Sequence, residues 1–110
     1  NVFHEPDRIP QDLIDYLSVS TFETENGVKA LASITRNVIA TEYEPDLLEE
    51  IDAETLIVWG AEDSVLDFRY AASFNRRISN SVLQAVPDCG HLPHVERPDV
   101  TAGIISRFLE

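Results

Sequence analysis

An acid and a histidine each follow a short apolar run in this sequence. The run 56–59 is followed by Asp63, and the run 81–86 is followed by Gly90 and His91. If the two runs are neighbouring parallel strands, these side chains lie outside the carboxyl ends of the strands, where open α/β sheets bind ligands. The pair would then supply the acid and the base of a hydrolytic triad.

The chemistry of such a pair follows from the histidine side chain. Its unperturbed pKa of about 6.5 lets it accept and return a proton near neutral pH. An acceptor at its second ring nitrogen must hold it in one tautomer, and we expect Asp63 to be that acceptor for His91. Asp63 would also stabilise the imidazolium that forms when a nucleophile loses its proton, without becoming protonated itself.

A nucleophile elbow is absent from the sequence. Such an elbow needs Gly-x-Ser-x-Gly, or a variant with Asp or Cys in the middle, because small neighbours permit its sharp turn. The chain has four glycines, no two of which are four residues apart: Gly27, Gly60, Gly90 and Gly103. We therefore expect the nucleophile in a complementary N-terminal segment of the same enzyme, and no turnover by this chain alone.

Two further acids, Glu62 and Asp67, compete with Asp63. Glu62 comes one residue before the matching position and is expected to point elsewhere. Asp67 fits the first turn of the next helix, where negative charge is favourable. The alternative in which Asp63 only closes a strand, and His91 only bonds to loop backbone, stays open on these residues alone.

His94 and Cys89 lie close to His91 in the sequence. Together with His91 and Glu96, His94 resembles a cluster of metal ligands, but Pro93 interrupts the regular helix that would bring the two histidines together. We expect no metal site, and we expect His94 to pack within the loop. Cys89 has no elbow of its own and is not expected to be the nucleophile.

The elements that must position the pair alternate between strand and helix. The continuous apolar run 56–59 is typical of a parallel strand covered on both faces. Apolar residues recur at helical spacing over 67–78, and 81–86 is a second short strand. Pro93 punctuates the loop that follows, and Pro98 begins a helix that runs to about residue 109. This order predicts a βαβα arrangement with a right-handed crossover.

The N-terminal half is expected to be largely helical. A loop, two helices and an acidic connection are predicted in order: 1–9, 10–19, 27–40 and 42–54. Pro10 fits the first helical position because its missing N–H is not needed there. Residues 21–27 form the break between the helices. The turn signal at Pro45-Asp46 precedes one helical turn before the first strand.

The composition is that of an ordinary globular domain, with 110 residues of which 44% are hydrophobic. The formal charge of -12 disfavours nucleic acid and anionic membrane as partners, because both attract cationic surface. No apolar run approaches the ~20 residues of a membrane helix. The single cysteine, Cys89, excludes an internal disulfide and agrees with a cytoplasmic location.

Two sequence blocks together resemble the C-terminal part of α/β-hydrolase-fold enzymes: Leu56-Ile57-Val58-Trp59-Gly60-x-x-Asp63 and Gly90-His91-x-Pro93-His94-x-Glu96-x-Pro98. The resemblance implies that Asp63, after the seventh strand, is the triad acid and that His91, after the eighth, is the base. It further implies that residues 1–45 are the end of a helical cap and the helix that re-enters the core. Residues 46–110 would be the C-terminal part of the hydrolase core.

The departures from the family pattern lie in loops. Glu54 and Ser64 stand where proline is common, and neither residue takes part in the expected reaction. Trp59 is expected to pack in the core rather than line a pocket, because it lies on an apolar strand. A cap tyrosine could bind substrate, but nothing local assigns that role to any of the tyrosines Tyr16, Tyr43 and Tyr70.

The resemblance implies hydrolysis of a small-molecule substrate by nucleophilic catalysis, most often at an ester-like carbonyl through an acyl-enzyme, with no cofactor. Esterase, C–C bond hydrolase, epoxide hydrolase and dehalogenase chemistry stay open. So does a non-enzymatic, ligand-binding or regulatory member of the fold, since a fold does not settle function. Two parallel strands alone leave an open edge, so we also expect pairing with the complementary segment or self-association.

Overall fold

The structure is a computed structural model that describes residues 2–40 and 45–110. The chain divides into two compact units. The larger unit joins the N-terminal residues up to Arg8 with Pro45–Glu110, and the smaller unit is Ile9–Glu44. The sequence-based division into cap and core segments stays a prediction.

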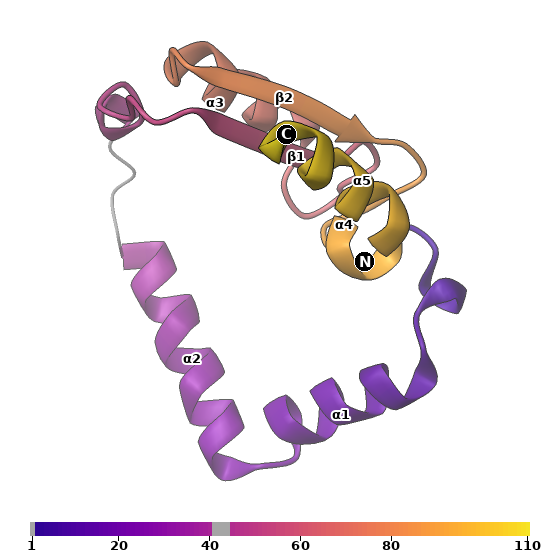
Figure 1. The fold of residues 1–110 in the computed structure, drawn as a ribbon. Helices are drawn as coiled ribbons and strands as arrows, with labels where there is room; N and C mark the ends of the chain where they lie inside the picture. Colours follow the sequence, from indigo (N-terminus) through magenta and orange to yellow (C-terminus); the bar gives the residue numbers. More distant parts are fainter. Residues whose placement is uncertain (1, 41–44) are drawn as a thin grey trace. The chain divides into compact units, whose positions relative to one another are not determined.

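In its described residues, the larger unit contains two strands, three α-helices and two 3-10 helices. Figure 1 labels the strands and the α-helices. In chain order these are η1 (Pro6–Arg8), η2 (Pro45–Leu48), β1 (Thr55–Gly60), α3 (Phe68–Arg77), β2 (Ser81–Val86), α4 (Pro93–Glu96) and α5 (Pro98–Leu109). The strands β1 and β2 pair in parallel, from Thr55 opposite Ser81 to Gly60 opposite Val86. The predicted strand, helix, strand, helix order of this part is therefore confirmed.

Helices α3 and α5 cover opposite faces of the two-stranded sheet. Ile57 of β1 packs with Ala71 of α3, whereas Val58 packs with Ile104 of α5. Successive side chains of a strand point to opposite faces, so both faces of β1 are apolar. This arrangement explains why the apolar run in the sequence is continuous rather than alternating.

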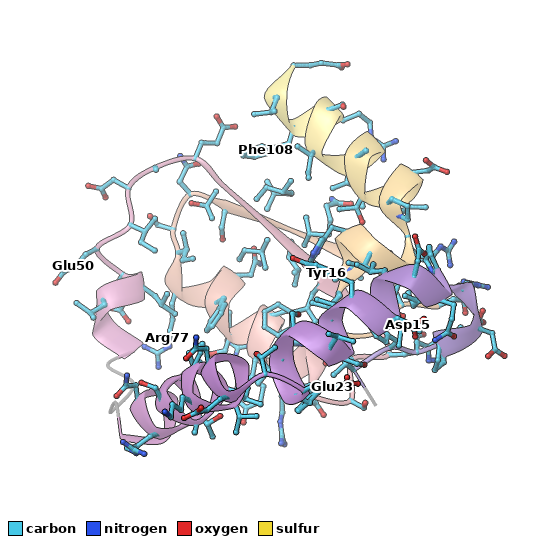
Figure 2. All side chains as sticks on the ribbon, turned by 90° about the horizontal axis from the view of Figure 1, so that it is seen from below. Asp15, Tyr16, Glu23, Glu50, Arg77 and Phe108 are labelled. Carbon is cyan, nitrogen blue, oxygen red and sulfur yellow. The ribbon has the colours of Figure 1, made fainter. Side chains whose placement is uncertain are left out.

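Helix α3 is held at both ends by charged side chains. Its N-cap residue, Asp67, accepts a 2.8 Å hydrogen bond from the backbone N–H of Arg69. At the other end, Arg77 (Figure 2) donates a hydrogen bond of 3.2 Å to Glu49. The prediction that Asp67 belongs to the start of this helix is confirmed, since a carboxylate at the N-cap satisfies one of the unpaired N–H groups of the first turn.

The helix that follows His91 was not expected. Pro93 was predicted to interrupt helical structure, but it is the first residue of α4. Proline is tolerated at this position because the N–H that it lacks has no partner within the helix. The same argument correctly places Pro98 at the first position of α5.

The smaller unit is formed by α1 (Gln11–Phe22) and α2 (Glu25–Ala40), which contact each other. Pro10 precedes α1 as its N-cap rather than standing at the first helical position, because its ψ of 130° is extended. The break between the helices is shorter than the predicted 21–27. Thr24 accepts a 3.0 Å hydrogen bond from the N–H of Gly27 through its hydroxyl oxygen, which caps α2 before the expected start.

Parts of the predicted connection lie outside the described residues. This holds for residues 41–44, and therefore for Tyr43. The helical turn expected after Pro45-Asp46 is confirmed by η2. Tyr16 lies on α1 with 69% of its surface exposed (Figure 2). None of the helices in the described part of the chain is long and apolar enough to cross a membrane.

Candidate active site

Asp63 lies in the turn that follows β1, and its carboxylate is fully engaged. One oxygen, Oδ1, accepts hydrogen bonds from the backbone N–H groups of Val65 (2.8 Å) and Leu66 (2.9 Å). The other, Oδ2, lies 2.9 Å from Nδ1 of His91. Only 3% of the Asp63 side chain is exposed. Aspartate commonly bonds to the backbone of its own turn, which here orients the second oxygen toward the histidine.

These contacts determine the charge of the Asp63 carboxyl group. Burial by itself raises its pKa, but the hydrogen bonds from Leu66, His91 and Val65 outweigh burial, and the pKa lies below the ordinary value of 3.8. Hydrogen bonds to the charged form favour that form. The side chain is therefore an anion at neutral pH, as the acceptor of a histidine N–H must be.

His91 follows β2 and presents its ring to the acid. Because an ionised carboxylate can only accept hydrogen bonds, the proton of a neutral imidazole lies on Nδ1, and Nε2 is the proton acceptor. The side chain is 31% exposed. On the backbone side, the N–H of His91 donates a 2.8 Å hydrogen bond to the carbonyl oxygen of Val2. The predicted pair is thus brought together, with the basic nitrogen turned away from the acid.

Gly60 allows the two loops to approach each other. A Cβ at this position would lie 1.9 Å from the carbonyl oxygen of Gly90 and 2.5 Å from that of Cys89. A backbone hydrogen bond joins the same loops, because the N–H of Glu62 donates to the carbonyl oxygen of Cys89 at 3.0 Å. Gly60 therefore does more than end the strand, since any side chain there would push the histidine loop away from the acid.

Glu62 does not reach the histidine. Its Oε2 accepts a 3.0 Å hydrogen bond from the backbone N–H of Cys89, and its own N–H donates to the carbonyl oxygen of Cys89 at 3.0 Å. The prediction that Glu62 points elsewhere is confirmed. Of the two adjacent acids, Asp63 pairs with the side chain of His91, and Glu62 pairs with the backbone of Cys89.

Cys89 is a buried free thiol. Burial, reinforced by the negative charge of Glu96, raises the pKa of the Cys89 thiol to about 11. The nucleophilic form of cysteine is the thiolate, and a raised pKa disfavours this form at neutral pH. The structure agrees with the expectation that Cys89 is not the nucleophile.

His94 and the other candidate metal ligands do not form a site. His94 is exposed on α4, so the prediction that it packs within a loop is wrong. Across residues 2–40 and 45–110, no group of three or more His, Cys, Asp and Glu side chains could hold a metal ion.

Trp59 both packs in the core and borders the pair. Its ring lies at 83° to that of Phe74, with the centroids 5.9 Å apart, and its Nε1 donates a 3.0 Å hydrogen bond to the carbonyl oxygen of Leu66. The predicted core role is therefore confirmed. Trp59 and Phe74 also line a cavity of about 340 Å³ beside Asp63 and His91, so the expectation that Trp59 would not line a pocket is wrong.

Comparison with known proteins reveals several similar hydrolases, whereas no family profile matches the sequence. The uncharacterized hydrolase YugF of Bacillus subtilis (strain 168) is 28% identical over 110 residues, which cover 100% of this chain and 40% of YugF. The monoacylglycerol lipase ABHD6 of Bos taurus is 30% identical over 108 residues, which cover 97% of this chain and 31% of the lipase.

A solved structure is similar over nearly the same range. CarC, a serine hydrolase involved in carbazole degradation, matches with a TM-score of 0.76 and 27% identity over 92% of this chain and 40% of CarC. The chain thus spans less than half the length of each of these proteins.

Proposed function

Because this chain belongs to the α/β-hydrolase superfamily and has the fold of its C-terminal part, we propose that it supplies the acid and the base of a nucleophile–histidine–acid triad. Asp63 is the acid and His91 is the general base. The observation that carries the proposal is the 2.9 Å contact between Nδ1 of His91 and Oδ2 of the buried Asp63 carboxylate.

The nucleophile belongs to a complementary N-terminal segment of the same enzyme. Nε2 of His91 takes the proton of the nucleophile as the nucleophile attacks the substrate carbonyl carbon. The resulting imidazolium gives that proton to the leaving group when the tetrahedral intermediate collapses to the acyl-enzyme. A water molecule then attacks the acyl group, with His91 again taking and returning the proton. Asp63 stays ionised throughout and stabilises the imidazolium.

The substrate class we propose is a small-molecule ester or related carbonyl compound. Support comes from two of the similar proteins, since one is named a monoacylglycerol lipase and the other a serine hydrolase. A serine hydroxyl is a weak nucleophile until an adjacent base activates it. A histidine that is oriented by an acid is such a base. The reaction needs no cofactor.

The test is ester hydrolysis by the intact protein that carries this chain. Initial rates with a chromogenic acetate ester are compared for the wild type and the His91→Ala variant. We expect turnover by the wild type and near-complete loss in the variant, because the variant lacks the imidazole that takes the proton of the nucleophile. Equal rates for the two proteins would refute the proposal.

An isolated chain of residues 1–110 provides the second arm of the test. It is expected to hydrolyse the ester no faster than free imidazole at the same concentration, because an acid and a base without a nucleophile offer no covalent route. Turnover well above that of imidazole, abolished by His91→Ala, would contradict the placement of the nucleophile outside this chain.

A further inference from the structure

Glu96, the last residue of α4, is a buried carboxylate whose oxygens accept hydrogen bonds from backbone N–H groups. It is 6% exposed. Both of its oxygens accept from the N–H of Gly90 at 3.1 Å. Oε2 also accepts from the N–H of His4 at 2.8 Å, and Oε1 accepts from the N–H of Leu92 at 3.4 Å. A buried charge is costly unless it is fully hydrogen-bonded, and these contacts supply the bonds that Glu96 requires.

The partners of Glu96 flank the catalytic histidine on both sides. Gly90 precedes His91 and Leu92 follows it, and both donate to the same carboxylate. The N–H between them, that of His91, donates to the carbonyl oxygen of Val2. Three successive N–H groups of the histidine loop thus have fixed acceptors. A backbone held at every residue leaves the imidazole ring few positions to occupy.

Close packing reinforces this attachment at Gly90. A Cβ at Gly90 would lie 2.8 Å from the backbone nitrogen of His4 and 3.0 Å from Oε1 of Glu96. The carboxylate reaches the loop because the residue there has no side chain. The N-terminal residues, α4 and the histidine loop therefore meet at one carboxylate.

We propose that Glu96 is a positioning residue, which holds the backbone on both sides of His91 and thereby keeps the imidazole ring against Asp63. For its consequence in catalysis the inference rests on the proposed function. Glu96 touches neither the ring nor the acid, so it acts through the loop.

The chemistry of the site requires a carboxylate rather than an amide. In the described part of the chain, the hydrogen-bond partners of Glu96 are N–H donors, and an ionised carboxylate is a pure acceptor. The NH₂ group of a glutamine cannot accept a hydrogen bond. In either orientation it would face the N–H of Gly90, which contacts both oxygens of Glu96. Glu96→Gln therefore places an NH₂ donor against the N–H donor of Gly90, with almost no change in the size of the side chain.

Thr101 offers a matched control. It lies on α5, is also 6% exposed, and its hydroxyl donates a 2.9 Å hydrogen bond to the carbonyl oxygen of Pro93. Thr101→Val removes a buried hydrogen bond of the same helical region without touching any backbone group from Gly90 to Leu92. The Thr101→Val variant therefore shows the effect of losing a buried hydrogen bond that does not hold the histidine loop.

The experiment measures two quantities in the intact protein for the wild type, Glu96→Gln and Thr101→Val. The first is the low-field proton NMR resonance of the His91 Nδ1–H, which requires the ring to stay bonded to Asp63. The second is kcat and KM for the chromogenic ester, at a temperature at which each variant is folded by circular dichroism. The resonance does not depend on turnover, so it tests the positioning of His91 even if the ester assay refutes the proposed function.

For Glu96→Gln we expect the resonance to broaden or vanish and kcat to fall by about 10²-fold with little change in KM, because a displacement of about 1 Å costs that much in the chemical step. Thr101→Val should lower the melting temperature but keep both the resonance and kcat. If Glu96→Gln is folded and keeps both, or if the two variants behave alike, the inference is overturned.

Glu96→Asp keeps the experiment decisive if Glu96→Gln does not fold. The shorter side chain retains the charge but cannot reach the N–H groups of His4, Gly90 and Leu92 together. We expect a partial loss of kcat and a weakened resonance. A folded Glu96→Asp variant with unchanged resonance and unchanged kcat would equally overturn the inference.

Discussion

Two adjacent carboxylates, Glu62 and Asp63, differ in role because of the hydrogen bonds each accepts. Asp63 is oriented by two backbone N–H groups of its own turn, so that its remaining oxygen faces His91. Glu62 is turned the other way and accepts from the backbone of Cys89. Asp63 can thus fix the tautomer of His91, whereas Glu62, the residue before it, joins two loops.

This difference can be measured by removing each charge in turn. In the intact protein, Asp63→Asn should lower kcat by a factor on the order of 10⁴, because the amide favours the wrong tautomer of His91. Glu62→Gln is the matched control and should change kcat little, since its amide oxygen can still accept from the N–H of Cys89. Steady-state ester hydrolysis by both variants decides the assignment, which would be off by one residue if Glu62→Gln were the damaging change.

The lowered pKa of Asp63 also predicts how the residue affects stability. The folded-state pKa lies below the ordinary value of 3.8, so the stabilising contribution is present above that pH and is lost as the pH falls through the folded-state pKa. We expect Asp63→Asn to be less stable than the wild type near neutral pH and the difference to shrink in acid. Urea unfolding of both proteins between neutral and acidic pH measures this difference in the free energy of unfolding. A difference that grows below the ordinary pKa would contradict the sign.

At the level of elements, the sequence predicts the helices and strands that local residue patterns determine. The strand β1 follows from a continuous apolar run, α3 from apolar residues at helical spacing and α5 from the proline at its first position. The Asp63–His91 pair follows from the fact that neighbouring parallel strands end at the same edge. The early start of α2 was missed because it depends on the cap formed by Thr24. The contacts of Glu96 could not be predicted, because one donor, His4, lies 92 residues away in the sequence.

The turn after β1 depends on Gly60, and this can be tested with a second glycine as control. In Gly60→Ala the new Cβ would lie 1.9 Å from the carbonyl oxygen of Gly90, so the histidine loop must move. We expect kcat to fall by about 10²-fold, as for other displacements of about 1 Å, together with a lower melting temperature.

Gly103→Ala is the matched substitution, because a Cβ at Gly103 meets nothing within 4 Å. Alanine in a helix is favoured over glycine by roughly 0.5–1 kcal/mol, so this variant should be at least as stable as the wild type and fully active. Thermal unfolding and ester kinetics of the two alanine variants provide the comparison. Equal behaviour would mean that the loop tolerates a side chain at position 60.

At the level of the whole molecule, the larger unit leaves apolar surface and a sheet edge exposed. Its sheet has two strands in the described part of the chain. Val65, Val82 and Ile105 are between 43% and 49% exposed. Parallel sheets are normally buried on both faces, and an open edge presents unpaired N–H and C=O groups to other strands. Both features favour association with further strands.

We therefore predict that residues 1–110 on their own associate with the complementary N-terminal segment or with a second copy through the open strand edge. Size-exclusion chromatography with light scattering, run on the chain alone and in a mixture with that segment, measures the mass of each species. Assembly through the edge of β2 should also depend on β-pairing, so Ala85→Pro, which removes an N–H that faces away from β1, should weaken it. A monomer that unfolds cooperatively without any partner would show that the two parallel strands and five α-helices of the described residues suffice for an independent fold.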